Sequence, residues 1–216
     1  APRAFFLSYR TTMHLLRLCL LLAVFTLCAA PTSRPHTAEK PVPFSLHELK
    51  KRSFRYFWDL ADPVNFQVLD RYPAKTFSSI AATGFGLTSY IVGAENGYVT
   101  RPQAAERVLN TLRVLKSLPQ GPDASGVSGY KGLFYHFLTL DKALRFKNVE
   151  LSTIDTGLLM AGVLSTMSYF DQDTPVEKEI RELADFLFRR VEWDWAMDGK
   201  NTMSMGWHPE SGFIKA

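Results

Sequence analysis

The chain has 216 residues, which suits one ordinary domain or part of a larger one. Hydrophobic residues make up 46% of the sequence and charged residues 21%, so disordered, collagen-like and disulfide-dense classes are excluded. The net charge of +4 resides in residues 1–40, and the remainder is neutral. The basic balance therefore gives no argument for nucleic-acid binding, and we expect no nucleic-acid partner.

Residues 13–30 have the parts of a secretory signal peptide. Met13 and Arg17 open a positively charged start, residues 18–30 are apolar, and Pro31 ends the run. This run is shorter than the roughly 20 residues that a membrane span needs. We therefore expect an exported protein, periplasmic or outer-membrane associated, and we interpret residues 1–12 as an upstream artefact.

Both cysteines, Cys19 and Cys28, lie in this leader, so the remainder can form neither a disulfide framework nor a thiolate metal site. A lipid anchor at Cys28 is an open alternative for contact with a membrane, although Leu27 stands where such a motif favours a small residue. Residues 31–44 are rich in proline and polar residues, which predicts an extended linker.

Helix boundaries are indicated by four capping boxes, in which Ser or Thr is followed three residues later by a carboxylate or amide. They predict helices from Ser45 to about Ala61, Thr100 to about Leu118, Ser152 to Phe170 and Thr174 to Arg190. A fifth helix is expected over Phe77–Glu95, whose small residues and missing charged face indicate burial.

The connections between these helices are long. Tyr130–Leu138 and Leu144–Lys147 are expected to pair as a short hairpin across Thr139–Ala143, and residues 193–213 show no clear helix. Successive helix pairs with elaborate loops predict an all-α fold, as a bundle, solenoid or toroid. A closed double-layered toroid needs about twice as many helices, so we expect the chain to stop midway.

A family resemblance is carried by long strings in order along the chain. They are SFRYFWDLADP (53–63), SIAATGFGLTSY (79–90), VTRPQAAERVL (99–109), ASGVSGYKGLFYHFL (124–138), VELSTIDTGLLMAGVL (149–164) and MGWHPESGF (205–213). The chain resembles the bacterial glycoamylase-like family, which is similar to endo-β-1,2-glucanases and to a domain of cyclic β-1,2-glucan synthases. The resemblance implies a partial (α/α)6 toroid that acts on glucans without a metal or cofactor, with residues 45–216 as its N-terminal half.

Glycoside hydrolysis uses two carboxyl groups, one of which protonates the leaving oxygen. That acid must keep its proton near neutral pH, which an apolar, aromatic setting favours. Glu210 lies between Trp207 and Gly212 in the string WHPESG, where the resemblance places the acid. We therefore expect Glu210 to be the catalytic acid, with an ordinary surface-turn glutamate as the alternative. The second carboxylate stays unassigned.

Glu150 and Asp155 flank the start of a predicted helix. Asp155 completes a capping box and favours the helix dipole, which alone would explain it. Because both residues match the family string, we also expect them to contact sugar or to support catalysis.

The remaining candidates for sugar contacts are charged residues in loops, aromatic residues with flat faces, and one histidine. They are Asp70, Arg71, Lys131, Tyr130, Tyr135, Trp193, Trp195, Trp207 and His208. A surface ion pair is the alternative for Asp70 and Arg71, and core packing is the alternative for the aromatic residues. In an extended segment, Trp193 and Trp195 would face the same side.

Other sites find no support. His136 and His208 are far apart in sequence with no carboxylate at ligand spacing, so neither is interpreted as a metal ligand. Gly84 and Gly86 lie within a helix pattern, which indicates packing rather than phosphate binding. The rivals to a glucan hydrolase are a non-catalytic glycan-binding or surface-assembly protein, a phosphorylase or lyase on the same scaffold, and a truncated product that cannot close its core.

Overall fold

The computed structural model describes residues 45–214. The expected upstream artefact, signal peptide, linker and Cys28 anchor therefore lie outside the described residues. The helices are α2 (Leu46–Leu60), α3 (Ile80–Glu95), α4 (Arg101–Ser117), α5 (Thr153–Tyr169), α6 (Pro175–Arg189) and the short α7 (Trp193–Ala196). The strands are β1 (Ser78–Ser79), β2 (Gly129–Tyr130), β3 (Leu133–Tyr135), β4 (Phe137–Leu138), β5 (Leu151–Ser152), β6 (Gly206–His208) and β7 (Gly212–Phe213).

The four predicted capping residues are confirmed, because each accepts a hydrogen bond from the backbone amide three residues on. The full reciprocal box forms at Thr100, where the Gln103 side chain accepts from the Thr100 amide. The fifth helix begins at Ile80 rather than Phe77, because Ser79 caps it and Ser78–Ser79 pair with β4.

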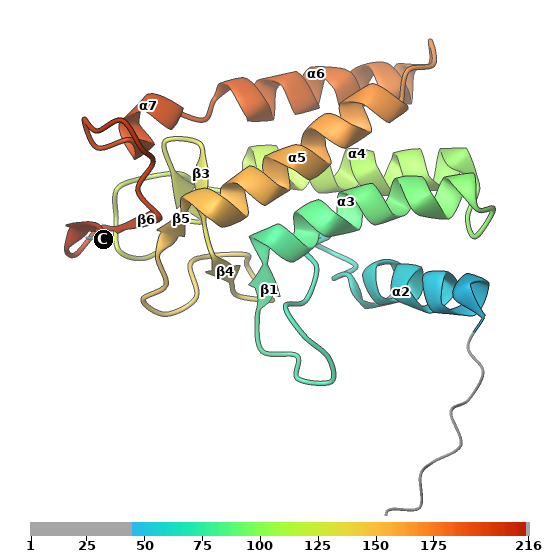
Figure 1. Cartoon of the computed structure of the whole chain (residues 1–216), viewed down its shortest axis with the longest axis horizontal. Helices are drawn as coiled ribbons and strands as arrows, with labels where there is room; N and C mark the ends of the chain where they lie inside the picture. Colours follow the sequence, from blue (N-terminus) through green and yellow to red (C-terminus); the bar gives the residue numbers. More distant parts are fainter. Residues whose placement is uncertain (1–44, 215–216) are drawn as a thin grey trace, which may run out of the picture. The chain divides into compact units, whose positions relative to one another are not determined.

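Helices α3 and α5 form the central pair of the helical layer. Both begin at the end where the strands gather and run away from it, whereas α2, α4 and α6 run in the opposite direction (Figure 1). A Cβ atom on Gly162 would lie 2.2 Å from the carbonyl oxygen of Gly84, so the two backbones are in direct contact. Gly84 therefore serves packing, as the sequence indicated.

The outer helices are joined to each other by a buried ion pair. Arg101 at the start of α4 donates through Nε and Nη2 to the carboxylate of Glu177 on α6, each at 2.9 Å. The side chain of Glu177 is 4% exposed. Its carboxylate is thereby drawn away from the Thr174 cap, and only half of the expected capping box forms there.

The strands make two small antiparallel sheets, with the orders β1-β4 and β2-β3-β5-β6-β7. The predicted hairpin turn is confirmed by hydrogen bonds from the Thr139 amide to Leu144 and from the Phe146 amide to Phe137. Its first arm is not one strand, because Lys131 and Gly132 adopt positive φ angles of 54° and 81°. The main partner of β3 is β5, which the sequence did not indicate.

The fold is therefore helix-rich, as expected, but it has two small sheets where the sequence predicted one short hairpin. Within residues 45–214, no helix has both the length and the apolar character that a membrane crossing requires.

Candidate functional site

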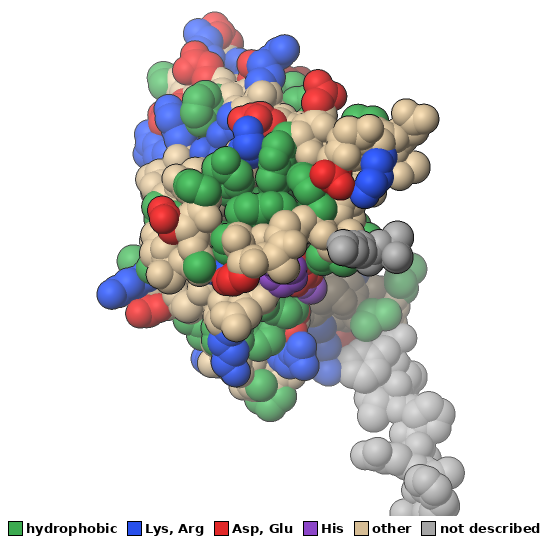
Figure 2. Space-filling model, turned by 90° about the vertical axis from the view of Figure 1, so that its left-hand side faces the viewer, with side chains coloured by type: hydrophobic (Ala, Val, Ile, Leu, Met, Phe, Trp, Pro, Cys, Tyr) green, Lys and Arg blue, Asp and Glu red, His purple; other side chains and the backbone are tan. Residues whose placement is uncertain are grey.

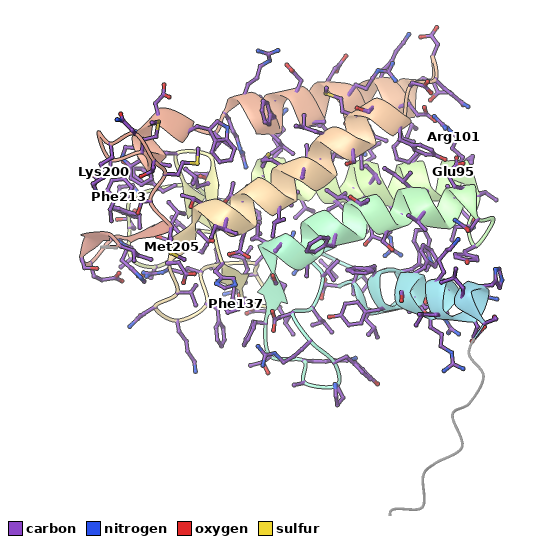
Figure 3. The ribbon with its side chains drawn as sticks, in the orientation of Figure 1. Glu95, Arg101, Phe137, Lys200, Met205 and Phe213 are labelled. Carbon is purple, nitrogen blue, oxygen red and sulfur yellow. The ribbon has the colours of Figure 1, made fainter. Side chains whose placement is uncertain are left out.

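The strand-bearing end of the domain gathers most of the polar and aromatic candidates. Phe137, Met205 and Phe213 mark this end in Figure 3, whereas Glu95 and Arg101 mark the other end of α3 and α4. Figure 2 looks onto the strand-bearing end and shows a hydrophobic area with histidine and acidic side chains at its lower edge.

Sheet register brings three of these polar residues into one row. Tyr135 pairs with Leu151, and Leu151 pairs with Trp207. If this antiparallel register is continued by one position, Glu150 lies opposite both His136, after β3, and His208, at the end of β6. The backbone amide of His136 donates to the Glu150 carbonyl oxygen at 3.0 Å. This row could not be read from the sequence, because it depends on the pairing of β3, β5 and β6.

Glycine at position 206 leaves room for the Glu150 side chain. A Cβ atom on Gly206 would lie 3.0 Å from Glu150 Cγ and 2.7 Å from the Leu151 carbonyl oxygen. Any larger residue there would press on the Glu150 side chain and the Leu151 backbone, so the glycine of the MGWHPESGF string shapes the site.

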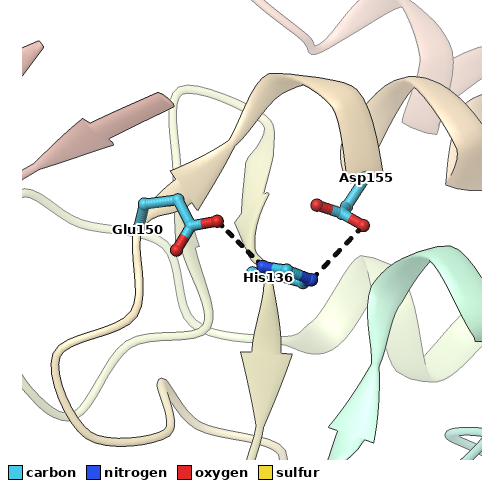
Figure 4. A group of neighbouring side chains, drawn as sticks. All are labelled: His136, Glu150 and Asp155. Carbon is cyan, nitrogen blue, oxygen red and sulfur yellow. Dashed lines mark hydrogen bonds and ion pairs between the residues drawn. The ribbon is translucent and has the colours of Figure 1, made fainter. Parts of the chain in front are cut away.

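The ring of His136 lies between two carboxylates (Figure 4). Nδ1 is 2.8 Å from Glu150 Oε1, a hydrogen bond, and Nε2 is 3.6 Å from Asp155 Oδ1, an ion-pair distance. The side chains are 31%, 27% and 15% exposed in the order His136, Glu150, Asp155. The expectation that His136 has no carboxylate at suitable spacing is thus wrong in three dimensions.

Asp155 has the two roles that the sequence allowed. Its backbone amide donates to Ser152 Oγ at 3.1 Å, and the Ser152 hydroxyl donates in return to the Asp155 carboxylate. The carboxylate therefore sits in the first turn of α5, where the helix dipole stabilises negative charge. It also faces the His136 ring, so Asp155 forms a polar cluster with His136 and Glu150.

His136, Glu150 and Asp155 each offer a metal-ligand atom within 4.8 Å of the others. However, the two ring nitrogens face different carboxylates, and one ion cannot occupy both sides of an imidazole. The geometry fits the sharing of protons better than a closed ligand set of three or four groups. The expectation that the protein holds no metal stays a prediction.

Glu210 has a different electrostatic setting from the one expected. Arg145 donates to it through Nη1 at 2.6 Å and Nη2 at 3.2 Å. The hydrogen bonds from Arg145 hold the pKa of the Glu210 carboxyl below its ordinary value. An acid that must keep its proton needs the opposite shift, so this ion pair does not supply the setting that was expected for Glu210, and its role as the catalytic acid stays a prediction.

Arg145 itself is fixed from several sides, with a side chain that is 1% exposed. It donates to the carbonyl oxygens of Ala124 and Val149, and it stacks 4.6 Å from the centre of the Tyr135 ring. Arg145 Nη2 also lies 3.4 Å from His208 Nδ1, which places His208 beside the Glu210 ion pair. Sequence reasoning missed Arg145, which carries no motif of its own.

The aromatic candidates pack on one another more than they offer free faces. Tyr135 is fully buried, so its predicted role as a sugar platform is wrong. Trp195 and Trp207 lie 5.5 and 5.4 Å from the Tyr130 ring, and all three are partly buried against the core. Trp195 also contacts Phe213, which closes the cluster at the end of the sheet.

Trp193 and Trp195 lie on α7 and not in an extended segment. Because helix positions two apart are rotated by roughly 200°, the two rings cannot share one side as expected. Lys131 lies over the rings of Tyr130 and Trp195 and pairs with Glu192 just before α7. Lys131 therefore borders the aromatic cluster.

Asp70 and Arg71 form an ion pair of 2.6 Å in the loop before β1, as their alternative interpretation predicted. Arg71 lies 5.6 Å from the Phe77 ring, which in turn contacts Phe137 at 4.3 Å. The pair is therefore separated from His136 by two aromatic side chains and does not join the polar cluster directly.

No family model matches the chain. In sequence it is 28% identical over 191 residues to an exo-β-1,2-glucooligosaccharide sophorohydrolase (non-reducing end) of Parabacteroides distasonis, which covers 85% of this chain and 25% of that protein. The chain thus spans about a quarter of this curated relative.

Solved structures show the same similarity. A glucoamylase-like protein of Bacteroides uniformis matches with a TM-score of 0.67 at 30% identity, over 78% of this chain and 42% of that chain. A β-1,2-glucanase of Parabacteroides distasonis matches with a TM-score of 0.65 at 25% identity, over 79% of this chain and 25% of that chain. The resemblance to glycoamylase-like proteins that the sequence strings indicated is therefore confirmed.

Proposed function

We propose that the protein is an exported glycoside hydrolase that acts on a glucan, with β-1,2-glucan as the first substrate to test. The relative from Parabacteroides distasonis is named for hydrolysis of β-1,2-glucooligosaccharides. The observation that carries the proposal is the placement of two carboxyl groups, Glu150 and Glu210, in contrasting surroundings at one end of the same sheet.

Contrasting surroundings are what acid and base roles require. Glu210 is held as a carboxylate by Arg145, which fits activation of water or stabilisation of positive charge on the sugar. Glu150 has no ion pair with lysine or arginine among the described residues, and it bonds instead to His136, which can carry a proton. We therefore assign Glu150 as the proton donor and Glu210 as the ionised partner.

The finer points of architecture and location belong to the same proposal. The parallel direction of α3 and α5, with α2, α4 and α6 running against them, supports an arc of an (α/α)6 toroid of which these residues form the N-terminal half. Export to the periplasm or the outer membrane, through a signal peptide at residues 13–30 and with Cys28 as the alternative lipid anchor, rests on the sequence pattern.

Sugar contacts are proposed for the residues that border the two carboxylates. Asp155 and His208 lie beside Glu150 and Glu210, and Lys131 borders the aromatic cluster of Tyr130, Trp195 and Trp207. Trp193, Asp70 and Arg71 lie further from the carboxylates and are placed at the rim.

The experiment is an assay of the protein on linear β-1,2-glucan, with the products separated by chain length, beside the variants Glu150→Gln and Glu210→Gln. Hydrolysis that falls at least about 100-fold in both variants supports the proposal, because each acid or base group contributes roughly 10²–10⁴-fold. Binding without hydrolysis would favour a glycan-binding protein. Release of sugar phosphate only when phosphate is added would favour a phosphorylase.

A further inference from the structure

We propose that His136 is a positioning residue that passes a proton to Glu150 and so supplies the proton donor in each turnover. This inference rests on the proposed function, because it concerns how the Glu150 acid is supplied. The proposal starts from the placement of one imidazole ring between two carboxylates that come from different elements (Figure 4).

The ring cannot move far from this position. The backbone of His136 is held on both sides, since its amide donates to the backbone carbonyl of Glu150 at 3.0 Å and its own carbonyl accepts from the amide of Ile80 at 3.2 Å. The ring also stacks on Phe137, with 3.8 Å between ring centres. Nδ1 is therefore directed at Glu150 and Nε2 at Asp155 by the fold and not by a free side-chain rotation.

The two carboxylates favour a hydrogen on each ring nitrogen. Asp155 is stabilised as an anion by the first turn of α5 and by the Ser152 hydroxyl. A nitrogen that faces an anion is favoured as a donor, and imidazole carries two donors only when it is protonated. One further proton, shared among the three groups, would give each ring nitrogen a hydrogen to donate.

Few other charged groups act on the ring. Glu150 on β5 and Asp155 on α5 are its direct partners within the described part of the chain. His208 and the Arg145–Glu210 pair lie on the β6 side beyond Glu150, and Arg71 with Asp70 lies beyond Phe77 and Phe137. Among residues 45–214, neither Glu150 nor Asp155 forms an ion pair with a lysine or arginine, so no such cation competes with the ring for the two carboxylates.

The reaction then balances in protons. The Nδ1 proton of His136 first moves to the Glu150 carboxylate. Glu150 gives this proton to the glycosidic oxygen as the carbon–oxygen bond breaks, and water adds to the anomeric carbon with loss of one proton to Glu210. The partly exposed ring then regains a proton from solvent, while Glu210 returns one to solvent, so the net change is addition of one water molecule across the bond.

The decisive variant is His136→Asn, whose amide nitrogen keeps a donor near the position of Nδ1 but carries no transferable proton. We expect kcat on β-1,2-glucan to fall about 100-fold with little change in KM. On a dinitrophenyl glycoside of the same sugar, which leaves without protonation, we expect less than about a threefold loss. The control is His47→Asn in the exposed first turn of α2, which leaves both rates unchanged.

A purely structural role for His136 would lower both rates equally, or neither, and either result overturns the proposal. A second measurement does not depend on activity. Nitrogen-15 NMR of the folded protein is expected to show both ring nitrogens of His136 protonated at neutral pH, and Glu150→Gln or Asp155→Asn should remove that state. A singly protonated ring in the unaltered protein would also overturn the proposal. Failure of glucan hydrolysis alone, with the doubly protonated ring present, would instead reject the proposed function.

Discussion

Arg145 and Glu210 form a two-point ion pair between a buried cation and a half-exposed anion. The Nη1–Oε1 and Nη2–Oε2 distances are 2.6 and 3.2 Å, and the two side chains are 1% and 46% exposed. A buried guanidinium needs such a partner, because an unpaired charge in the interior is costly. The same pairing keeps Glu210 ionised and presents its carboxylate to solvent beside His208.

The pH profile of activity should report this ion pair. In Arg145→Lys the two-point hydrogen bonding is lost, so we expect the pKa of Glu210 to rise toward its ordinary value. Because Glu210 acts as the ionised group, activity falls on the acidic side as it takes up a proton. The acidic limb of kcat/KM against pH should therefore move to higher pH.

Arg113→Lys is the control for that experiment, because Arg113 forms a surface pair with Glu179 on the outer helices. Its pH profile should match that of the unaltered protein. An acidic limb that moves to lower pH in Arg145→Lys, or does not move, would contradict the role given to Glu210.

The Arg101–Glu177 pair should govern stability in acid. Hydrogen bonds from Arg101 lower the pKa of Glu177 below its ordinary value of 4.5. The unfolded chain then binds a proton that the folded chain does not, so this stabilisation is present above about pH 4.5 and is lost as the pH falls further. We expect Glu177→Gln to lower the free energy of unfolding at pH 7 by about 3 kcal/mol.

Urea unfolding at a series of pH values measures both effects. The difference between Glu177→Gln and the unaltered protein should shrink as the pH falls below 4.5, the ordinary value of this carboxyl. Glu179→Gln on the same helix, whose partner Arg113 is half-exposed, should change stability little. Equal losses from the two variants would show that burial of the Arg101 pair is not what matters.

The contact between α3 and α5 requires glycine at position 162 but not at position 157. In Gly162→Ala the new Cβ atom would meet the Gly84 carbonyl at 2.2 Å, so the helices must separate. We expect a loss of about 1–3 kcal/mol in the free energy of unfolding. Gly157→Ala on the same helix has no atom within 4 Å of its Cβ and should be neutral or stabilising. A neutral Gly162→Ala in thermal unfolding would contradict the packing.

Local features of the fold could be predicted from the sequence, because their causes lie within a few residues. The caps at Ser45, Thr100, Ser152 and Thr174 are each set by one side chain and the first turn that follows. The prediction failed where four residues were too few to show a period, as at Trp193 and Trp195, which form a helical turn.

The sequence singled out Glu150, Asp155 and Glu210, and the structure places them at the strand-bearing end of the domain. Their electrostatic partners, however, come from distant parts of the chain and could not be predicted. Arg145 lies 65 residues before Glu210, and His136 reaches Glu150 only through the pairing of β3 with β5. Such partners decide which carboxyl keeps a proton, and no local pattern encodes them.

The most direct test of the account is hydrolysis of linear β-1,2-glucan by the unaltered protein, by Glu150→Gln and by Glu210→Gln, with an activated dinitrophenyl glycoside assayed in parallel. We predict that Glu150→Gln loses at least about 100-fold on the glucan and little on the activated substrate, whereas Glu210→Gln loses activity on both. The reverse pattern, with Glu210→Gln spared on the activated substrate, would show that Glu210 is the acid and would contradict the assignment made from the Arg145 ion pair.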